Sequence, residues 1–269
     1  MDLAAKIISV ISGNRRGRAG PIAPAGRHDT SRVDSAVSVL FQKGQRPAQQ
    51  DIRLLSEESG EFTLASSSAG MVELLANGLT FDLGGLAPET SLEHPDTAYT
   101  FGFEDGDSVE PTEAITLRPG PHLAGGGTMP PVVRCLALLA AILSGLPGAQ
   151  AVVWHPARSR SSPAYFRRSV MRWIEGGVFP GLGLTGLATL PDGGLESEGL
   201  ALFVGRELRI SSGTATSPAD TAKLALRLLH WLVENGGLAE RLSLTGPSGE
   251  PLEMCPLPDE KIVEVRRSG

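Results

Sequence analysis

The sequence has few of the residues that build disulfide-bonded or metal-binding proteins. It contains only two cysteines, Cys135 and Cys255, in 269 residues. Two cysteines cannot form a disulfide framework or a zinc site of four thiolates. The five histidines are scattered, and none has the paired spacing of a metal-binding motif. We therefore expect no metal, no cofactor and a reducing, cytoplasmic location.

A long uninterrupted apolar run is also missing. A helix that crosses a membrane needs about 20 apolar residues, whereas the run at 132–146 is shorter and contains Arg134. The N-terminal residues do not resemble a signal peptide, because their charge follows the apolar part instead of preceding it. We expect no membrane span. A helix that is apolar on all sides must be buried, so residues 131–143 predict one long apolar helix in the core.

No recognisable catalytic motif is present, and we predict no catalytic residue. The glycine-rich stretch at 122–128 precedes the predicted helix, where backbone N–H groups can bind an anion. It is neither the dinucleotide-binding pattern nor a P-loop. The favoured interpretation is a connector capped by Thr128. Residues 246–249, Gly-Pro-Ser-Gly, do not form a nucleophile elbow.

The charge is unevenly distributed. The formal net charge is -6, yet residues 1–34 carry six basic and three acidic side chains. The rest of the chain is therefore acidic, which argues against nucleic acid as a partner. Residues 84–113 hold eight acidic residues and no lysine or arginine. A loop of this length is usually functional or partly disordered.

Five arginines cluster around the helix start at Ser162-Pro163, at positions 158, 160, 167, 168 and 172. We interpret them as a solvated helix face; the alternative is a patch that binds an anionic ligand or an acidic partner. His155 ends a predicted strand, and strand ends often line sites. The candidate ligand-binding residues are therefore His122, Gly125, Gly126, Gly127, Thr128, His155, Arg158, Arg160 and Arg168.

The hydrophobic pattern predicts an α+β fold with mixed or antiparallel sheets and about four to five helices. Asn77-Gly78 predicts a hairpin between 71–76 and 79–83. A second hairpin is expected between 184–190 and 199–210. Further strands are expected at 36–41, 61–65, 114–117, 151–155, 251–255 and 261–265. Besides 131–143, helices are expected at 47–58, 163–175 and 218–235, the last capped by Ser217.

The domain organisation follows from composition. Residues 1–34 are expected to form a short helix followed by a flexible, basic arm rich in glycine, proline and arginine. Residues 35–269 are expected to form a single α+β domain, with 35–120 and 121–269 as alternative halves.

The second part of the chain resembles an uncharacterised bacterial family, domain of unknown function 4261. Three stretches carry the resemblance: 121–143, 149–166 and 198–210, the last followed by a helix and the Gly236-Gly237 stop. The most specific part is the run of Gly199-Leu200, Phe203, Gly205 and Glu207. The family has a threonine before this glycine, where this chain has Glu198. The resemblance implies one α+β domain over roughly 35–269 and transfers no activity or catalytic residue.

Together these observations predict a bacterial cytoplasmic protein that works without catalysis, as a protein-binding, accessory or immunity-type domain. The expected partner is another protein. One alternative is a hydrolase or transferase with an unrecognised site around His122 and His155. A second alternative is a sensor of anionic small ligands that uses the arginines. The enzyme hypothesis requires His155 and the glycine stretch to line one pocket.

Overall fold

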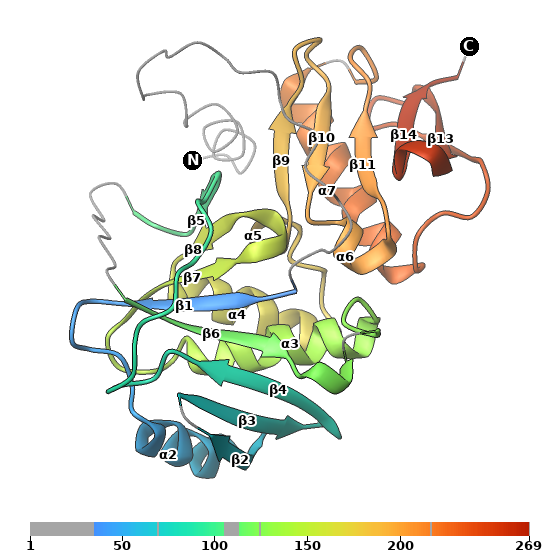
Figure 1. The fold of residues 1–269 in the computed structure, drawn as a ribbon. Helices are drawn as coiled ribbons and strands as arrows, with labels where there is room; N and C mark the ends of the chain where they lie inside the picture. The colour runs from blue at the N-terminus through green and yellow to red at the C-terminus, as the bar shows by residue number, and fades with distance from the viewer. Residues whose placement is uncertain (1–34, 69, 105–112, 124, 216, 269) are drawn as a thin grey trace. The chain divides into compact units, whose positions relative to one another are not determined.

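The computed structural model describes residues 35–68, 70–104, 113–123, 125–215 and 217–268. The described chain forms two compact units, one from Ser35 to Gly186 and one from Leu187 onward. Each unit is built around its own β-sheet (Figure 1). The arm predicted at 1–34 lies outside the described residues.

The first unit contains an eight-stranded sheet in the order β2-β3-β4-β6-β1-β7-β8-β5. All neighbouring strands are antiparallel except β5 and β8, which are parallel. The strands are β1 (Val37–Phe41), β2 (Thr63–Ser68), β3 (Met71–Ala76), β4 (Leu79–Gly84), β5 (Tyr99–Phe101), β6 (Glu113–Pro119), β7 (Ala149–Trp154) and β8 (Ser159–Ser161).

The hairpin predicted around Asn77-Gly78 is confirmed. Strands β3 and β4 pair with Ala76 opposite Leu79. Asn77 and Gly78 have φ angles of 52° and 76°, as a two-residue turn requires. Alternation along the hairpin then buries Leu74 and Phe81 on one side and turns Leu75 and Thr80 to the other.

Four helices belong to this unit: α2 (Gln49–Ser59), α3 (Pro130–Leu143), α4 (Pro163–Ile174) and the short α5 (Gly181–Leu184). Eleven of the fourteen residues of α3 are buried. Helix α3 packs against β1, β4, β6 and α4, and α4 packs against β7. The Ser162 side chain accepts a hydrogen bond from the Tyr165 amide and caps α4. Two 3-10 turns, η1 (Pro121–Leu123) and η2 (His155–Ala157), follow β6 and β7.

The second unit contains a six-stranded sheet in the order β12-β13-β14-β11-β10-β9. Strand β14 is parallel to β11 and antiparallel to β13. The strands are β9 (Gly186–Thr189), β10 (Leu195–Glu198), β11 (Glu207–Ile210), β12 (Leu242–Thr245), β13 (Pro251–Leu257) and β14 (Ile262–Arg267), with the 3-10 turn η3 (Pro258–Glu260) before β14.

This second sheet is accompanied by two helices. The longer one, α7 (Pro218–Glu234), packs against β10 and β11, and its N-terminus is capped by Ser217 as predicted. The shorter one, α6 (Ala201–Val204), is a single turn between β10 and β11. The Ser217 hydroxyl oxygen accepts from the Asp220 amide at 3.2 Å.

The α+β class with mixed sheets is confirmed, and several details differ. The described residues form six helices, because α5 and α6 are four-residue turns that the sequence did not predict. The strand expected at 199–210 is wrong: it contains α6 followed by β11, and β11 pairs with β10. Strands β5, β8, β10 and β12 were not predicted. Within the acidic loop predicted at 84–113, the last residue of β4, all of β5 and the first residue of β6 are strand. Residues 105–112 lie outside the described residues.

The alternative halves at 35–120 and 121–269 do not match the boundary between the sheets. Strands β1 and β6 precede residue 120 and β7 follows it, yet β1 pairs with both β6 and β7 in one sheet. The boundary between the two compact units falls at 186/187. None of the described helices combines the length and hydropathy that crossing a bilayer requires.

Candidate functional site

His155, the first residue of η2, takes part in a buried chain of hydrogen bonds with Ser38 on β1 and Thr116 on β6. Its Nε2 lies 2.8 Å from Ser38 Oγ, and Ser38 Oγ lies 2.9 Å from Thr116 Oγ1. Ser38 on β1 and Thr116 on β6 are register partners, so their side chains leave the same face of the sheet. All three side chains are buried. The His155 amide also donates to the Ala36 carbonyl at 3.1 Å.

A hydrogen bond between serine and histidine is the contact that activates a nucleophile. Here it lies inside the sheet: Ser38 has no exposed surface, and its hydroxyl also contacts Thr116. An acyl substrate would have to reach Oγ in the middle of a strand. Buried polar groups normally satisfy one another in this way. The arrangement therefore accounts for His155 as part of the packing of β1, β6 and β7.

The glycine stretch forms a turn before α3. The Gly126 amide donates to the Leu123 carbonyl at 2.8 Å, and the Met129 amide donates to Gly126 at 2.9 Å. Met129 is the N-cap of α3 and no side chain caps the helix, so the predicted cap by Thr128 is wrong. Proline at the first two positions of α3 removes N–H donors that a capping side chain or an anion would use.

The candidate residues of the glycine stretch and of η2 differ in exposure and in neighbours. His122 is exposed in η1, and Gly127 lies beside Ser35: a Cβ on this glycine would be 3.8 Å from Ser35 Oγ. Arg158 is exposed in the left-handed conformation after η2, with φ of 46°. Gly125 and Thr128 are exposed and Gly126 is half-buried in the same turn.

Two of the candidate arginines lie on opposite sides of the sheet. Trp154 on β7 contacts Phe166 of α4, with 6.5 Å between ring centroids. Arg160 is the register partner of Val153, whose side chain points away from that helix because strand residues alternate. Its guanidinium stacks on Phe103 at 5.4 Å. Arg168 is exposed on α4 itself. Because Arg160 points to the other side of the sheet, the two arginines cannot bind the same small anion.

Cys135 on α3 is a buried thiol. Its Sγ lies 3.7 Å from the Ala76 carbonyl, to which it donates, and accepts from Asn77 Nδ2 at 3.9 Å. Burial raises the pKa of the Cys135 thiol. A raised pKa lowers the thiolate fraction, and the thiolate is the reactive form. Cys135 is thus a core residue.

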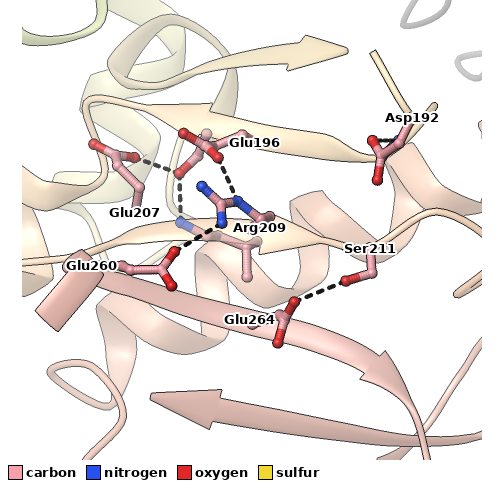
Figure 2. A network of polar contacts seen from close by, with 10 residues as sticks. Asp192, Glu196, Glu207, Arg209, Ser211, Glu260 and Glu264 are labelled. Atoms are coloured by element: carbon pink, nitrogen blue, oxygen red, sulfur yellow. Dashed lines mark hydrogen bonds and ion pairs between the residues drawn. The ribbon is translucent and has the colours of Figure 1, made fainter. Parts of the chain in front are cut away.

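The Glu207 carboxylate, which the sequence analysis did not single out, stabilises a turn in the second unit. Glu207 accepts hydrogen bonds from the amides of Gly199, Leu200 and Ala201 at 2.9, 3.1 and 3.0 Å. The Ser197 hydroxyl donates to it at 2.5 Å (Figure 2). Burial raises the pKa of Glu207, and these donors offset part of that effect. One carboxylate therefore holds the tight turn between β10 and β11.

The residues Gly199, Leu200, Phe203, Gly205 and Glu207 together build this turn. Gly199 and Gly205 have positive φ angles, 94° and 75°, at the two ends of α6. Leu200 and Phe203 are buried beneath it, and Glu207 binds its first amides. Each residue of the pattern has a structural task. The available signal was a glutamate placed just after a short apolar turn that begins and ends with glycine.

Figure 2 also shows the polar contacts of Arg209 and Ser211 with three carboxylates. Arg209 Nε lies 2.7 Å from Glu196, and Arg209 Nη1 lies 3.1 Å from Glu260. These carboxylates raise the pKa of Arg209. Ser211 donates to Glu264 at 3.2 Å. These contacts are partly exposed, and Glu260 contributes from η3 instead of from a strand.

A different surface of the first unit exposes large apolar side chains. Met71 and Leu75 on β3 are 45% and 39% exposed, and Leu92 is 37% exposed. A Cβ on Gly84 of β4 would lie 3.1 Å from Leu92 and 3.6 Å from Met71, so both side chains border this glycine. Between the apolar residues, Glu73 and Asp82 are register partners. We call Met71, Glu73, Leu75, Asp82 and Leu92 the acidic face.

Searches against protein-family models, curated proteins and solved structures gave no significant match to this chain.

Proposed function

We propose that the protein is a non-catalytic protein-binding domain whose acidic face contacts the partner. The observation that carries this proposal is the pattern of exposure on β3. Met71 and Leu75 project from a well-paired strand into solvent, on either side of a carboxylate. Scattered apolar residues are normal on a surface, whereas a group of them on one rigid face is typical of an interaction site.

The chemistry of this face indicates a partner that is both apolar and basic. Residues 49–104, which include β2 to β5, hold ten acidic residues and a single arginine, Arg53. Complementary charge steers association and excludes partners of the same sign. Methionine is enriched in interfaces because its flexible thioether adapts to differently shaped surfaces. A patch of Met71, Leu75 and Leu92 surrounded by carboxylates fits this description.

The chemically capable side chains support a binding role because each has a structural use. The Ser38 hydroxyl and the His155 ring bond to each other inside the sheet. Glu207 binds three backbone amides of its own turn. The candidate residues Arg160 and Arg168 lie on opposite sides of the sheet. A binding domain needs none of them to meet.

Two free cysteines, Cys135 and Cys255, both buried, support the proposed cytoplasmic location. Reducing compartments keep such thiols unpaired. An accessory or immunity-type role and a relation to domain of unknown function 4261 are parts of the same proposal. Both fit a domain that recognises another protein.

The proposal is tested with a pair of matched single variants. Leu75 on β3 and Leu242 on β12 are strand leucines with similar exposure, 39% and 37%. We expect Leu75→Glu to lose a captured partner protein that both the wild type and Leu242→Glu retain. Circular dichroism and thermal unfolding check that both variants are folded. A partner retained equally by all three proteins would contradict a role for the acidic face.

A hydrolase is the second candidate, favoured only by the Ser38–His155 distance of 2.8 Å. A fluorophosphonate probe labels serines that a histidine activates. Labelling of the wild type that disappears in Ser38→Ala would support catalysis. We expect no labelling, because Ser38 is completely buried and shares its hydroxyl with Thr116.

A further inference from the structure

Helix α4 exposes three arginines on its surface. Arg167, Arg168 and Arg172 are exposed, and none of them forms an ion pair with a residue in the described ranges. The Gly177 amide donates to the Arg172 carbonyl at 2.8 Å, which keeps Val178 next to this arginine. Val178 is 59% exposed. We call Arg167, Arg168, Arg172 and Val178 the arginine face.

The three arginines of the arginine face belong to a stretch without acidic residues, which ends before the exposed Glu175. Residues 119–174 contain six arginines and no aspartate or glutamate. The preceding part, 49–104, has the opposite composition, with ten acidic residues and one arginine. One unit therefore carries both an acidic surface and a basic surface, each with exposed apolar side chains. The two surfaces have opposite charge, and both include exposed apolar residues.

The two faces lie on opposite sides of the first unit. Helix α3 packs against β4, where Phe81 and Leu83 are completely buried. Asp82 lies between them, and alternation turns its side chain away from α3. Helix α4 packs against α3 and β7 on the helical side of the sheet. Helices α3 and α4 lie together against the eight-stranded sheet (Figure 1). The arginine face, on α4, and the acidic face, on the side of the sheet to which Asp82 points, are therefore separated by the sheet and the helices. They cannot neutralise each other within one copy.

We propose that the acidic face binds the arginine face of a second copy of this chain. The inference rests on the proposed function, since it names the partner of the same face. Because each copy has one face of each kind, the contact is head to tail. Such a heterologous contact closes into a ring only if the rotation between copies allows it, and otherwise continues into a chain.

Sedimentation velocity of the purified full chain is the test. At low ionic strength we expect the weight-average sedimentation coefficient to increase with protein concentration. In about 1 M salt, where the Debye length is about 3 Å, it should return to the value of a monomer. A wild type that stays monomeric at every concentration in low salt would overturn the proposal.

Charge reversal identifies the surfaces. We expect Arg168→Glu/Arg172→Glu to weaken self-association at least about tenfold, because it replaces attraction by repulsion at the contact. Glu73→Lys/Asp82→Lys should do the same from the other side. The matched control is Lys223→Glu/Arg227→Glu, which reverses two exposed cations with the same spacing on α7. Association that survives both face variants, or that the control also abolishes, contradicts the proposal.

A mixture of the two face variants gives the decisive result. The arginine-face variant still has a native acidic face, and the acidic-face variant still has native arginines. Each alone should remain monomeric, while an equimolar mixture should form a complex through one native contact. Two folded variants that do not associate when mixed would overturn the inference.

This experiment separates the two proposals. One outcome is that the wild type is monomeric and still captures a different protein that Leu75→Glu does not capture. In that case the acidic face binds another partner, and only the second-copy inference fails. If Leu75→Glu has no effect on capture and the charge variants none on sedimentation, the proposed function fails as well.

Discussion

Glu73 on β3 and Asp82 on β4 are direct register partners on an exposed side of the eight-stranded sheet. Like charges placed directly opposite each other on antiparallel strands destabilise the sheet. Arg118 on β6 is the register partner of Asp82 on its other side, so Asp82 has a cation beside it on the sheet. Glu73 has no such neighbour on β2, whose paired residue is Ser66.

Neutralising Glu73 should therefore stabilise the isolated protein while weakening its interactions. We expect Glu73→Gln to raise the free energy of unfolding by roughly 0.2–1 kcal/mol, measured by urea titration. Asp82→Asn should gain less, because it also removes the neighbour of Arg118. A loss of stability in Glu73→Gln would show that this carboxylate is not under repulsion.

The turn held by Glu207 predicts a large difference between two glutamates of the same sheet. Glu207→Gln places an amide group among three N–H donors, and we expect a loss of about 1–3 kcal/mol. Glu196→Gln removes a partly exposed ion pair with Arg209 and should cost at most about 1 kcal/mol. Equal losses in urea unfolding would argue that the three amide contacts of Glu207 contribute little.

Glu113 predicts a pH-dependent contribution to stability. The Gly44 amide and the Arg46 side chain donate to its carboxylate and hold the pKa of Glu113 below its ordinary value of 4.5. A lowered folded-state pKa contributes stability above the unfolded pKa that disappears as pH falls through the folded pKa. The wild type should thus exceed Glu113→Gln in stability at pH 7, and the difference should shrink below pH 4.5. A difference that does not change with pH would contradict this assignment.

The polar chain at His155 predicts unequal effects for its two hydroxyls. Ser38→Ala leaves both Thr116 and His155 without the hydroxyl that joins them and should cost about 1–3 kcal/mol. Thr116→Val keeps the contact between Ser38 and His155, so its loss should be smaller. Urea unfolding at neutral pH measures both. A larger loss of stability in Thr116→Val than in Ser38→Ala would indicate that Thr116 is the more important polar partner of Ser38.

We expect the largest loss of stability from a core substitution in helix α3. Leu139 is completely buried, and Leu139→Ala should cost about 2–5 kcal/mol through lost contacts and a residual cavity. Leu54 on α2 is 53% exposed, and Leu54→Ala should change stability by at most about 0.5 kcal/mol. Chemical unfolding of the two variants compares them directly. Similar small effects would mean that α3 is loosely packed.

The sequence predicted elements whose signals are local. Asn77-Gly78 gives a hairpin because both residues adopt positive φ angles, and Ser217 caps α7 with its own side chain. Strands β5 and β8 have three residues each and pair in parallel over a long separation in sequence. Such strands are defined by their neighbours and leave no periodic pattern. The turn at 199–201 was missed because its amides bind a carboxylate six to eight residues later.

For the candidate sites, too, local features were predictable from the sequence and long-range contacts were not. The sequence identified His155 as the end of a strand, but Ser38 lies 117 positions away and only the sheet order brings them together. A serine between two valines on β1 was the one local hint. The acidic composition of 84–113 was clear, whereas the acidic face depends on which residues of β3 and β4 point outward. That choice is made by the hairpin register and by the burial of Phe81 and Leu83.

Strand β14 occupies a central position in the second sheet, between β13 and β11. Without it, β9, β10 and β11 have no contact through the sheet with the pair of β12 and β13. During synthesis, these strands emerge from the ribosome before residues 262–267 do. The second sheet can therefore be completed only after residues 262–267 have been translated. Until then its earlier strands have unpaired edges, which favour binding by chaperones.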